Sequence, residues 1–135
     1  MMQSLFAYGT LQLPEILERV IGRHVQGIPA TLADYRSGLV ARANFPGIVP
    51  KSGSIVEGSL ITGFSPHEIQ LLDQYEGELY RRILVTVLTQ DTDAHPKQCW
   101  VYVIVPWAKT RVTETPWTIQ WYREQGAKGR LTYRS

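Results

Sequence analysis

The chain holds one cysteine, Cys99, among 135 residues, so an internal disulfide framework is excluded, and a lone thiol fits a reducing compartment. No apolar stretch approaches the roughly 20 residues that a membrane-spanning helix needs. No run of Lys and Arg has the density of a nucleic-acid footprint, because 14 basic residues are nearly balanced by 12 acidic ones. We therefore expect a soluble cytoplasmic protein with no nucleic-acid partner and no membrane partner.

The sequence also lacks targeting and metal-binding signals. Residues 1–5 have no basic region and no long apolar region, so they do not resemble a secretory signal peptide. The three histidines, His24, His67 and His95, are scattered without metal-ligand spacing and are expected at the surface. Cys99 lies in an apolar segment with no motif around it, which favours a buried, inert thiol over a nucleophile.

The length of the chain suits one domain, residues 1–135, and a chain of this size buries about two-thirds of its surface on folding. No repeat, low-complexity segment or linker divides it. Many short strands with a few short helices predict an α+β domain built on a curled sheet or small barrel. Residues 126–135 form a basic tail that we expect to be loosely ordered.

Capping signals predict three helices. A proline at the start and a glycine after the end predict a helix over 14–21. Ser65 and Glu68 form a capping box, with proline at the first helical position between them, and predict a second helix to about residue 75, with Gly77 as its C-terminal cap. A third helix is expected over 116–125.

Short β-rich segments separated by glycine and proline predict the strands. The expected strands cover 25–33, 38–43, 55–64, 80–88 and 98–105. Segment 45–50 contains two prolines, which cannot donate to a central ladder, so we expect it at an edge or corner. Residues 51–53 are expected to form a turn, and residues 90–97 a polar turn.

The most informative segment is Tyr8-Gly9-Thr10-Leu11, which follows the apolar run 5–7. That run is too short for a helix and predicts a strand, which Gly9 ends because glycine adopts positive φ freely. Backbone N–H groups left unpaired at the strand end could hold an anion or a developing oxyanion. The alternative is an ordinary strand end. The Tyr8 hydroxyl could bind a substrate, whereas for Thr10 the backbone is favoured over the hydroxyl.

Glu76 stands at the end of the second predicted helix, where unpaired carbonyl groups carry partial negative charge. This field, with any burial, would raise the pKa of the Glu76 carboxyl toward neutrality, which is the condition for a proton-transferring group. The alternative is a solvated surface carboxylate. Asp73 shares the same helix face and either raises that pKa further by repulsion or is itself a solvated acid.

These segments together resemble the γ-glutamylcyclotransferase superfamily, in its small AIG2-like branch of γ-glutamylamine cyclotransferase-like proteins. Residues 8–11 resemble the substrate-loop signature, and residues 72–77 (Leu-Asp-Gln-Tyr-Glu-Gly) resemble the catalytic-glutamate segment. Segments 45–49, 56–60 and 80–82 also match the branch in order. The resemblance covers about residues 5–105, and the longer insertions of the glutathione-acting relatives are lacking.

The resemblance implies a small mixed β-barrel with short flanking helices and a pocket at one end, with no metal and no cofactor. It implies that a small γ-glutamyl amine or peptide cyclises to 5-oxoproline and releases a free amine or amino acid, with Glu76 as general base and then acid. The substrate-binding residues that it implies are Tyr8, Gly9, Thr10 and Leu11. The alternative is a non-catalytic domain of this fold that binds a small metabolite; a protein-interaction domain is a third hypothesis. We expect a monomer or weak homodimer.

Four further residues near the proposed site leave alternatives open. Arg81 and Arg82 alternate on a predicted strand, so only one of them can face a pocket, where it could clamp a carboxylate. Tyr80 and Tyr102 are expected in the core or at a rim, and either could line the pocket.

Overall fold

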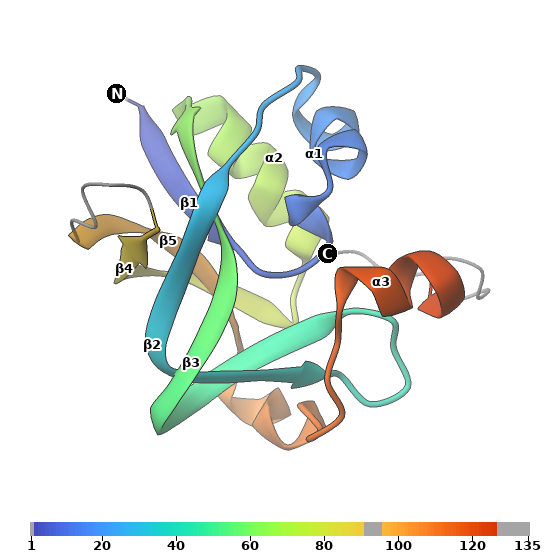
Figure 1. Cartoon of the computed structure of the whole chain (residues 1–135). Helices are drawn as coiled ribbons and strands as arrows, with labels where there is room; N and C mark the ends of the chain where they lie inside the picture. Colours follow the sequence, from blue (N-terminus) through green and yellow to red (C-terminus); the bar gives the residue numbers. More distant parts are fainter. Residues whose placement is uncertain (1, 91–95, 127–135) are drawn as a thin grey trace.

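The computed structural model describes residues 2–90 and 96–126 (Figure 1). Its strands are β1 (Gln3–Ala7), β2 (Ile28–Leu39), β3 (Pro46–Phe64), β4 (Tyr80–Thr89) and β5 (Pro96–Ile104). Its helices are α1 (Pro14–Ile21), α2 (Pro66–Glu76) and α3 (Ile119–Trp121), with the short helical turns η1 (Thr10–Gln12), η2 (Pro106–Arg111) and η3 (Tyr122–Gly126). The expected basic tail from residue 127 onward lies outside the described residues.

The five strands close into a barrel in the order β1-β3-β2-β4-β5. The pair β1–β5 is parallel and the other pairs are antiparallel, so the barrel is mixed. Helices α1 and α2 contact each other and cover one side of it (Figure 1). The predicted α+β class, a small mixed barrel with short flanking helices, is confirmed. Among the described residues, no helix is long and apolar enough to cross a membrane.

Strands β2 and β3 form one long hairpin. The strand expected over 25–33 is present from Ile28 but continues to Leu39, so the separate strand expected over 38–43 and the turn expected over 51–53 are wrong. Asp34 has φ 68° at a shift in register and its carboxylate accepts a hydrogen bond from the Gly53 N–H at 3.0 Å. Gly53 itself has φ 85°, so its glycine signal marks a β-bulge at which the hairpin bends sharply (Figure 1). Chain reversal occurs instead between Leu39 and Pro46.

Segment 46–50 pairs with β2 and with no other described strand, which confirms the edge position that its prolines predicted. The predicted strands over 80–88 and 98–105 correspond to β4 and β5. Strand β5 begins at Pro96, earlier than expected, so the end of the predicted polar turn is extended chain. The remainder of that turn, 91–95, lies outside the described residues.

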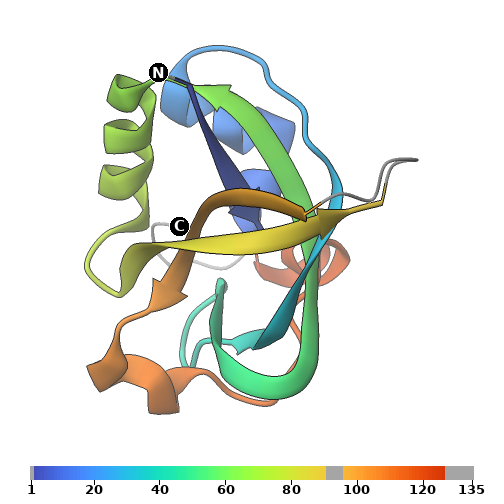
Figure 2. The ribbon, with the colours of Figure 1, turned by 90° about the vertical axis from the view of Figure 1, so that its left-hand side faces the viewer.

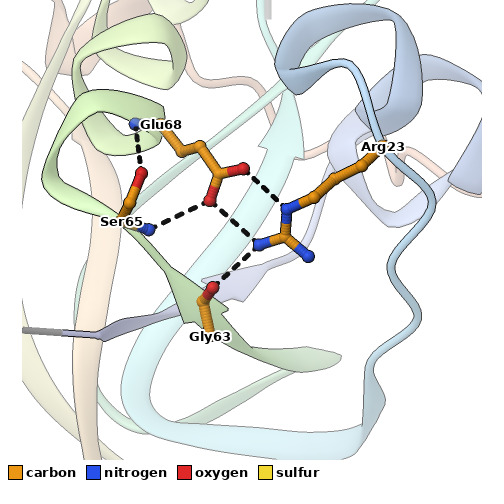
Figure 3. A network of polar contacts seen from close by, with 4 residues as sticks. All are labelled: Arg23, Gly63, Ser65 and Glu68. Carbon is orange, nitrogen blue, oxygen red and sulfur yellow. Dashed lines mark hydrogen bonds and ion pairs between the residues drawn. The ribbon is translucent and has the colours of Figure 1, made fainter.

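Helices α1 and α2 confirm the capping signals. Gly22 closes α1 with φ 86°, and Ser65 and Glu68 form both hydrogen bonds of the capping box at the start of α2. Figure 3 shows what the sequence did not predict: Arg23, directly after α1, binds the Glu68 carboxylate through Nε at 2.6 Å and Nη2 at 2.9 Å. Arg23 also donates to the Gly63 carbonyl, so one side chain ties α1, β3 and α2 together.

The last helix begins later than predicted. It starts at Ile119, because the Thr118 hydroxyl accepts the Trp121 N–H as an N-terminal cap, and it continues as a π-helical turn to Gly126. Trp117 therefore precedes the helix; it is buried, and its indole N–H donates to the Asn44 carbonyl at 3.0 Å.

Two apolar clusters hold the fold together. One fills the barrel, and the other lies between the barrel and the helices. Cys99 is buried in the first cluster, as predicted, and burial raises the pKa of its thiol to about 11. His24 and His67 are exposed, as predicted, and His95 lies outside the described residues.

Candidate functional site

A narrow pocket opens where the end of β1, the start of β3 and the end of α2 meet. Its cavity volume is about 20 Å³, little more than one water molecule needs. All five residues that the sequence singled out line this pocket: Tyr8, Gly9, Thr10, Leu11 and Glu76. The rest of the wall is made by Leu5, Phe6, Ala7, Pro46, Tyr80 and Tyr102.

Gly9 lies between the end of β1 and the start of η1, but not in the conformation expected of it. Its φ is −117°, so the predicted positive φ is wrong. Glycine is favoured here for a different reason: a Cβ atom at Gly9 would lie 3.2 Å from Cγ of Pro46, which is tighter than ordinary carbon contacts. Gly9 therefore lets the loop pass close to Pro46, on the opposite wall of the pocket.

The backbone of the loop forms the first turn of η1. The N–H groups of Gln12 and Leu13 donate back to the carbonyl groups of Gly9 and Thr10, at 3.1 and 2.9 Å. The first N–H groups of such a turn have no earlier carbonyl group inside the turn to which they can donate. The loop backbone therefore lies beside the pocket, where the sequence predicted donors to an anion, and that role stays a prediction.

The side chains of the loop are held by the protein. Tyr8 is buried, and its hydroxyl donates to the backbone carbonyl of Tyr102 at 2.6 Å. Burial raises the pKa of the Tyr8 phenol well above its usual value, and the charge of Glu76 raises it further. The Thr10 hydroxyl lies 3.1 Å from the hydroxyl of Tyr75, and Leu11 is a buried apolar wall residue. The side chains therefore shape the loop, which leaves its backbone to meet a ligand.

Glu76 is the last residue of α2, and its side chain lines the pocket although it is 9% exposed. The alternative of a solvated surface carboxylate is therefore wrong. Burial raises the pKa of the Glu76 carboxyl well above its usual value, and the nearby charge of Asp73 raises it further. Within residues 2–90 and 96–126, no hydrogen bond to this carboxyl group is found. A buried acid without a protein partner is available to a ligand.

Asp73 lies one turn before Glu76 and is more than a solvated acid. The Arg82 guanidinium donates to both of its carboxylate oxygens, from Nε at 2.8 Å and from Nη2 at 3.1 Å. The Tyr102 hydroxyl donates to the same carboxylate at 2.7 Å. Arg82 thus binds a carboxylate of the protein itself, and it is not among the residues that line the pocket.

Tyr80 and Tyr102 both line the pocket, a role that the sequence left undecided. Figure 2 shows how α2 leads through a short loop into β4, which lies beside β5. Tyr80 begins β4, Tyr102 lies on β5, and both line the pocket together with Glu76. The Tyr80 hydroxyl donates to the Pro46 carbonyl at 2.5 Å. Strand parity carried the missing signal: Arg82 shares a strand face with buried Tyr80, whereas Arg81 lies on the other face of the strand and is exposed.

The arrangement offers one proton acceptor and a set of backbone donors across a narrow, mostly apolar space. Within the described part of the chain, no group of three or more His, Cys, Asp or Glu residues is placed to hold a metal ion. The fold and the site together define the class of this protein as a small mixed barrel with a buried carboxyl group in a pocket beside the 8–11 loop.

The family model described as "Gamma-glutamyl cyclotransferase, AIG2-like" matches residues 5–121, and the chain belongs to this family. The chain is 32% identical over 108 residues to "AIG2-like protein D" of Arabidopsis thaliana, an alignment that covers 80% of this chain and 69% of that protein. Other AIG2-like proteins of Arabidopsis thaliana are matched over about half of their length.

Solved structures agree with this family. A solution structure from Arabidopsis thaliana superposes with a TM-score of 0.77 at 26% identity, covering 95% of this chain and 76% of the other. A structure described as "Gamma-glutamyl cyclotransferase" superposes with a TM-score of 0.66 at 21% identity, covering 78% of this chain and 68% of the other, which shows a shared fold. Family and fold together suggest an activity of the cyclotransferase type.

Proposed function

We propose that this protein is a γ-glutamylcyclotransferase-type enzyme, which converts a small γ-glutamyl amine or peptide into 5-oxoproline and a free amine or amino acid. The observation that carries the proposal is the position of Glu76. This acid is buried, has no hydrogen-bond partner among the described residues, and shares a narrow pocket with the backbone of the 8–11 loop. The family to which the chain belongs supports the type of reaction.

The first step needs a base. The α-amino group of the substrate is an ammonium ion at neutral pH and must lose a proton before its nitrogen can attack the γ-carbonyl carbon. In its ionised form, the Glu76 carboxylate accepts that proton. The raised pKa of Glu76 brings it closer to that of the ammonium group, which makes the transfer less unfavourable. The bound ammonium group in turn stabilises the ionised form of Glu76.

The attack forms the C–N bond of the five-membered ring and moves an electron pair onto the carbonyl oxygen. The backbone N–H groups of the 8–11 loop are the donors available to this oxyanion, or to the α-carboxylate of the substrate. Because nucleophile and electrophile belong to one molecule, holding the folded conformer supplies much of the rate.

The second step breaks the bond between the former γ-carbonyl carbon and the leaving nitrogen. Protonated Glu76 returns its proton to that nitrogen, so one carboxyl group acts as base and then as acid. The second proton of the ring nitrogen leaves as the lactam forms and is taken up by the released amine. Protons and electrons therefore balance without a cofactor.

The direct test is to incubate the purified protein with a panel of γ-glutamyl amines, amino acids and dipeptides and to measure 5-oxoproline. We expect product from at least one member, and a loss of about 100-fold or more in kcat for Glu76→Gln, as is typical for removal of a general base. Glu78→Gln is the matched control, because Glu78 is an exposed carboxylate two residues away. Absence of product from the whole panel, or full activity in Glu76→Gln, would overturn the proposal.

The same pocket could bind a metabolite without turnover, and a thermal-shift screen with the same panel separates the two functions. Stabilisation by a γ-glutamyl compound with no 5-oxoproline formed would favour the binding domain. Stabilisation with product supports the enzyme.

A further inference from the structure

The Asp73 carboxylate is held from two strands at once. Arg82, on β4, binds both of its oxygens, and Tyr102, on β5, donates its hydroxyl to one of them. The central carbon of the Arg82 guanidinium lies 4.1 Å from the centroid of the Trp100 ring, so the cation also stacks on an aromatic face of β5. The two hydrogen bonds to Asp73 and the contact with the Trp100 ring fix the Arg82 guanidinium in one orientation. A lysine could not reproduce these contacts.

This cluster adjoins the pocket through two of its members. Tyr102 lines the pocket, and Asp73 precedes Glu76 by one helical turn. The ionisable groups around Glu76 come from every element packed against it: Tyr8 after β1, Asp73 on α2, Tyr80 and Arg82 on β4, and Tyr102 on β5. In this set Arg82 is the cation, and it meets Asp73 directly.

We propose that Arg82 is a positioning residue for Glu76: its two-point ion pair compensates the charge of Asp73 and, through Asp73, holds the Tyr102 ring in the pocket wall. This inference rests on the proposed function for its meaning in catalysis. The claim about Glu76 itself concerns charge alone and can be measured without any substrate.

These contacts determine how the charge of Arg82 affects the pKa of Glu76. Asp73 raises the pKa of Glu76 because like charges one turn apart disfavour a second negative charge. Without Arg82, the negative charge of Asp73 would be uncompensated, and the pKa of Glu76 would rise further. Glu76 would then be ionised, and able to accept a proton, only at higher pH. Arg82 therefore extends the pH range in which the base is ready.

The experiment titrates Glu76 by carbon-13 NMR of side-chain carboxyl groups, with the signal assigned from its absence in Glu76→Gln. In Arg82→Ala the pKa of Glu76 should rise by roughly 0.5 to 1 unit, the size expected for one partly screened charge. In Arg82→Lys the pKa of Glu76 should rise less, because lysine keeps the positive charge. Asp73→Asn should lower the pKa of Glu76, and Arg82→Ala should raise that pKa less in the Asp73→Asn background, because Asp73 no longer holds the guanidinium in place.

Arg81→Ala is the matched control, since it removes the same charge from the neighbouring, exposed position on the other face of β4. An equal shift in Arg81→Ala and Arg82→Ala, or a rise of undiminished size when Arg82→Ala is added to Asp73→Asn, would overturn the inference. If Arg82→Ala does not fold, Arg82→Gln and Asp73→Asn carry the same comparison. With either variant of Arg82, the shift in the pKa of Glu76 has to depend on Asp73.

Activity supplies an independent readout. The acid limb of the pH profile of kcat/KM should move to higher pH in Arg82→Ala by the same amount as the pKa of Glu76. A protein that forms no 5-oxoproline would defeat the proposed function, while the NMR titration would still decide the role of Arg82. An active protein whose acid limb stays in place in Arg82→Ala would defeat this inference and leave the proposed function intact.

Discussion

The Tyr8 hydroxyl donates a buried hydrogen bond of 2.6 Å to the backbone carbonyl of Tyr102, a residue 94 positions away in the chain. The same Tyr102 donates its own hydroxyl to Asp73 on α2. One residue of β5 therefore joins the candidate substrate loop to the helix that carries the candidate base, Glu76. The distance between the 8–11 loop and Glu76, the two halves of the candidate site, depends on these contacts.

Replacing Tyr8 by phenylalanine tests this connection. The variant keeps the ring but leaves the Tyr102 carbonyl without this donor, so we expect the free energy of unfolding to fall by about 1 kcal/mol. Urea unfolding measures this loss. Because the loop is held less firmly, kcat/KM for any substrate found should fall as well. Unchanged stability in Tyr8→Phe would contradict the structural role of this bond.

Glu76 should make the protein less stable at high pH. Its pKa is raised in the folded state above the ordinary 4.5, so the protein holds this proton more tightly when folded. The resulting stability is complete below pH 4.5 and is lost as the pH rises through the raised folded-state pKa. Relative to Glu76→Gln, the wild-type protein should lose up to about 1.4 kcal/mol per pH unit in that window.

Chemical unfolding of the wild-type protein and Glu76→Gln at several pH values between 4 and 9 measures this slope. Glu78→Gln serves as the control, and its stability should follow that of the wild-type protein. A constant difference between the wild-type protein and Glu76→Gln over the whole range would show that Glu76 is not perturbed by folding.

Replacing Thr10 by valine separates the hydroxyl of the loop from its backbone. Valine has nearly the same shape and keeps the N–H group, but it loses the contact with the Tyr75 hydroxyl. If the backbone binds the substrate, kcat/KM should fall by less than about tenfold, the limit that a loss of about 1.4 kcal/mol sets. A loss as large as that of Glu76→Gln would instead assign the binding role to the hydroxyl.

Acid should weaken the link between α1 and α2 (Figure 3). The Arg23 guanidinium lowers the pKa of Glu68 from 4.5 to about 2, so the folded state favours the ionised carboxylate. This stability is present above pH 4.5 and is lost as the pH falls through about 2. Arg23→Ala should therefore lower the melting temperature at pH 7 and reduce the loss on acidification. Thermal melts from pH 7 to pH 2 measure both effects, and Arg19→Ala, an exposed cation on α1, is the control.

Local signals predicted much of the fold. The glycine after α1 and the capping box of α2 depend only on neighbouring residues, and both helices appear where these signals place them. Glycine was less informative inside strands, because it marks any special backbone geometry. At Gly53 that geometry is a bulge opposite Asp34, and at Gly9 it is the close approach of Pro46. Neither partner could be identified from the neighbouring sequence.

The sequence by itself determined the α+β class, the ends of α1 and α2, and the two segments that carry the candidate site, since each depends on residues close together in the chain. Tertiary structure decided the rest. Only barrel closure places Glu76 beside the 8–11 loop, removes its solvent and thereby raises its pKa. Only the pairing of β4 with β5 brings Arg82 and Tyr102 to Asp73, because residues distant in sequence meet there through packing and not through local preference.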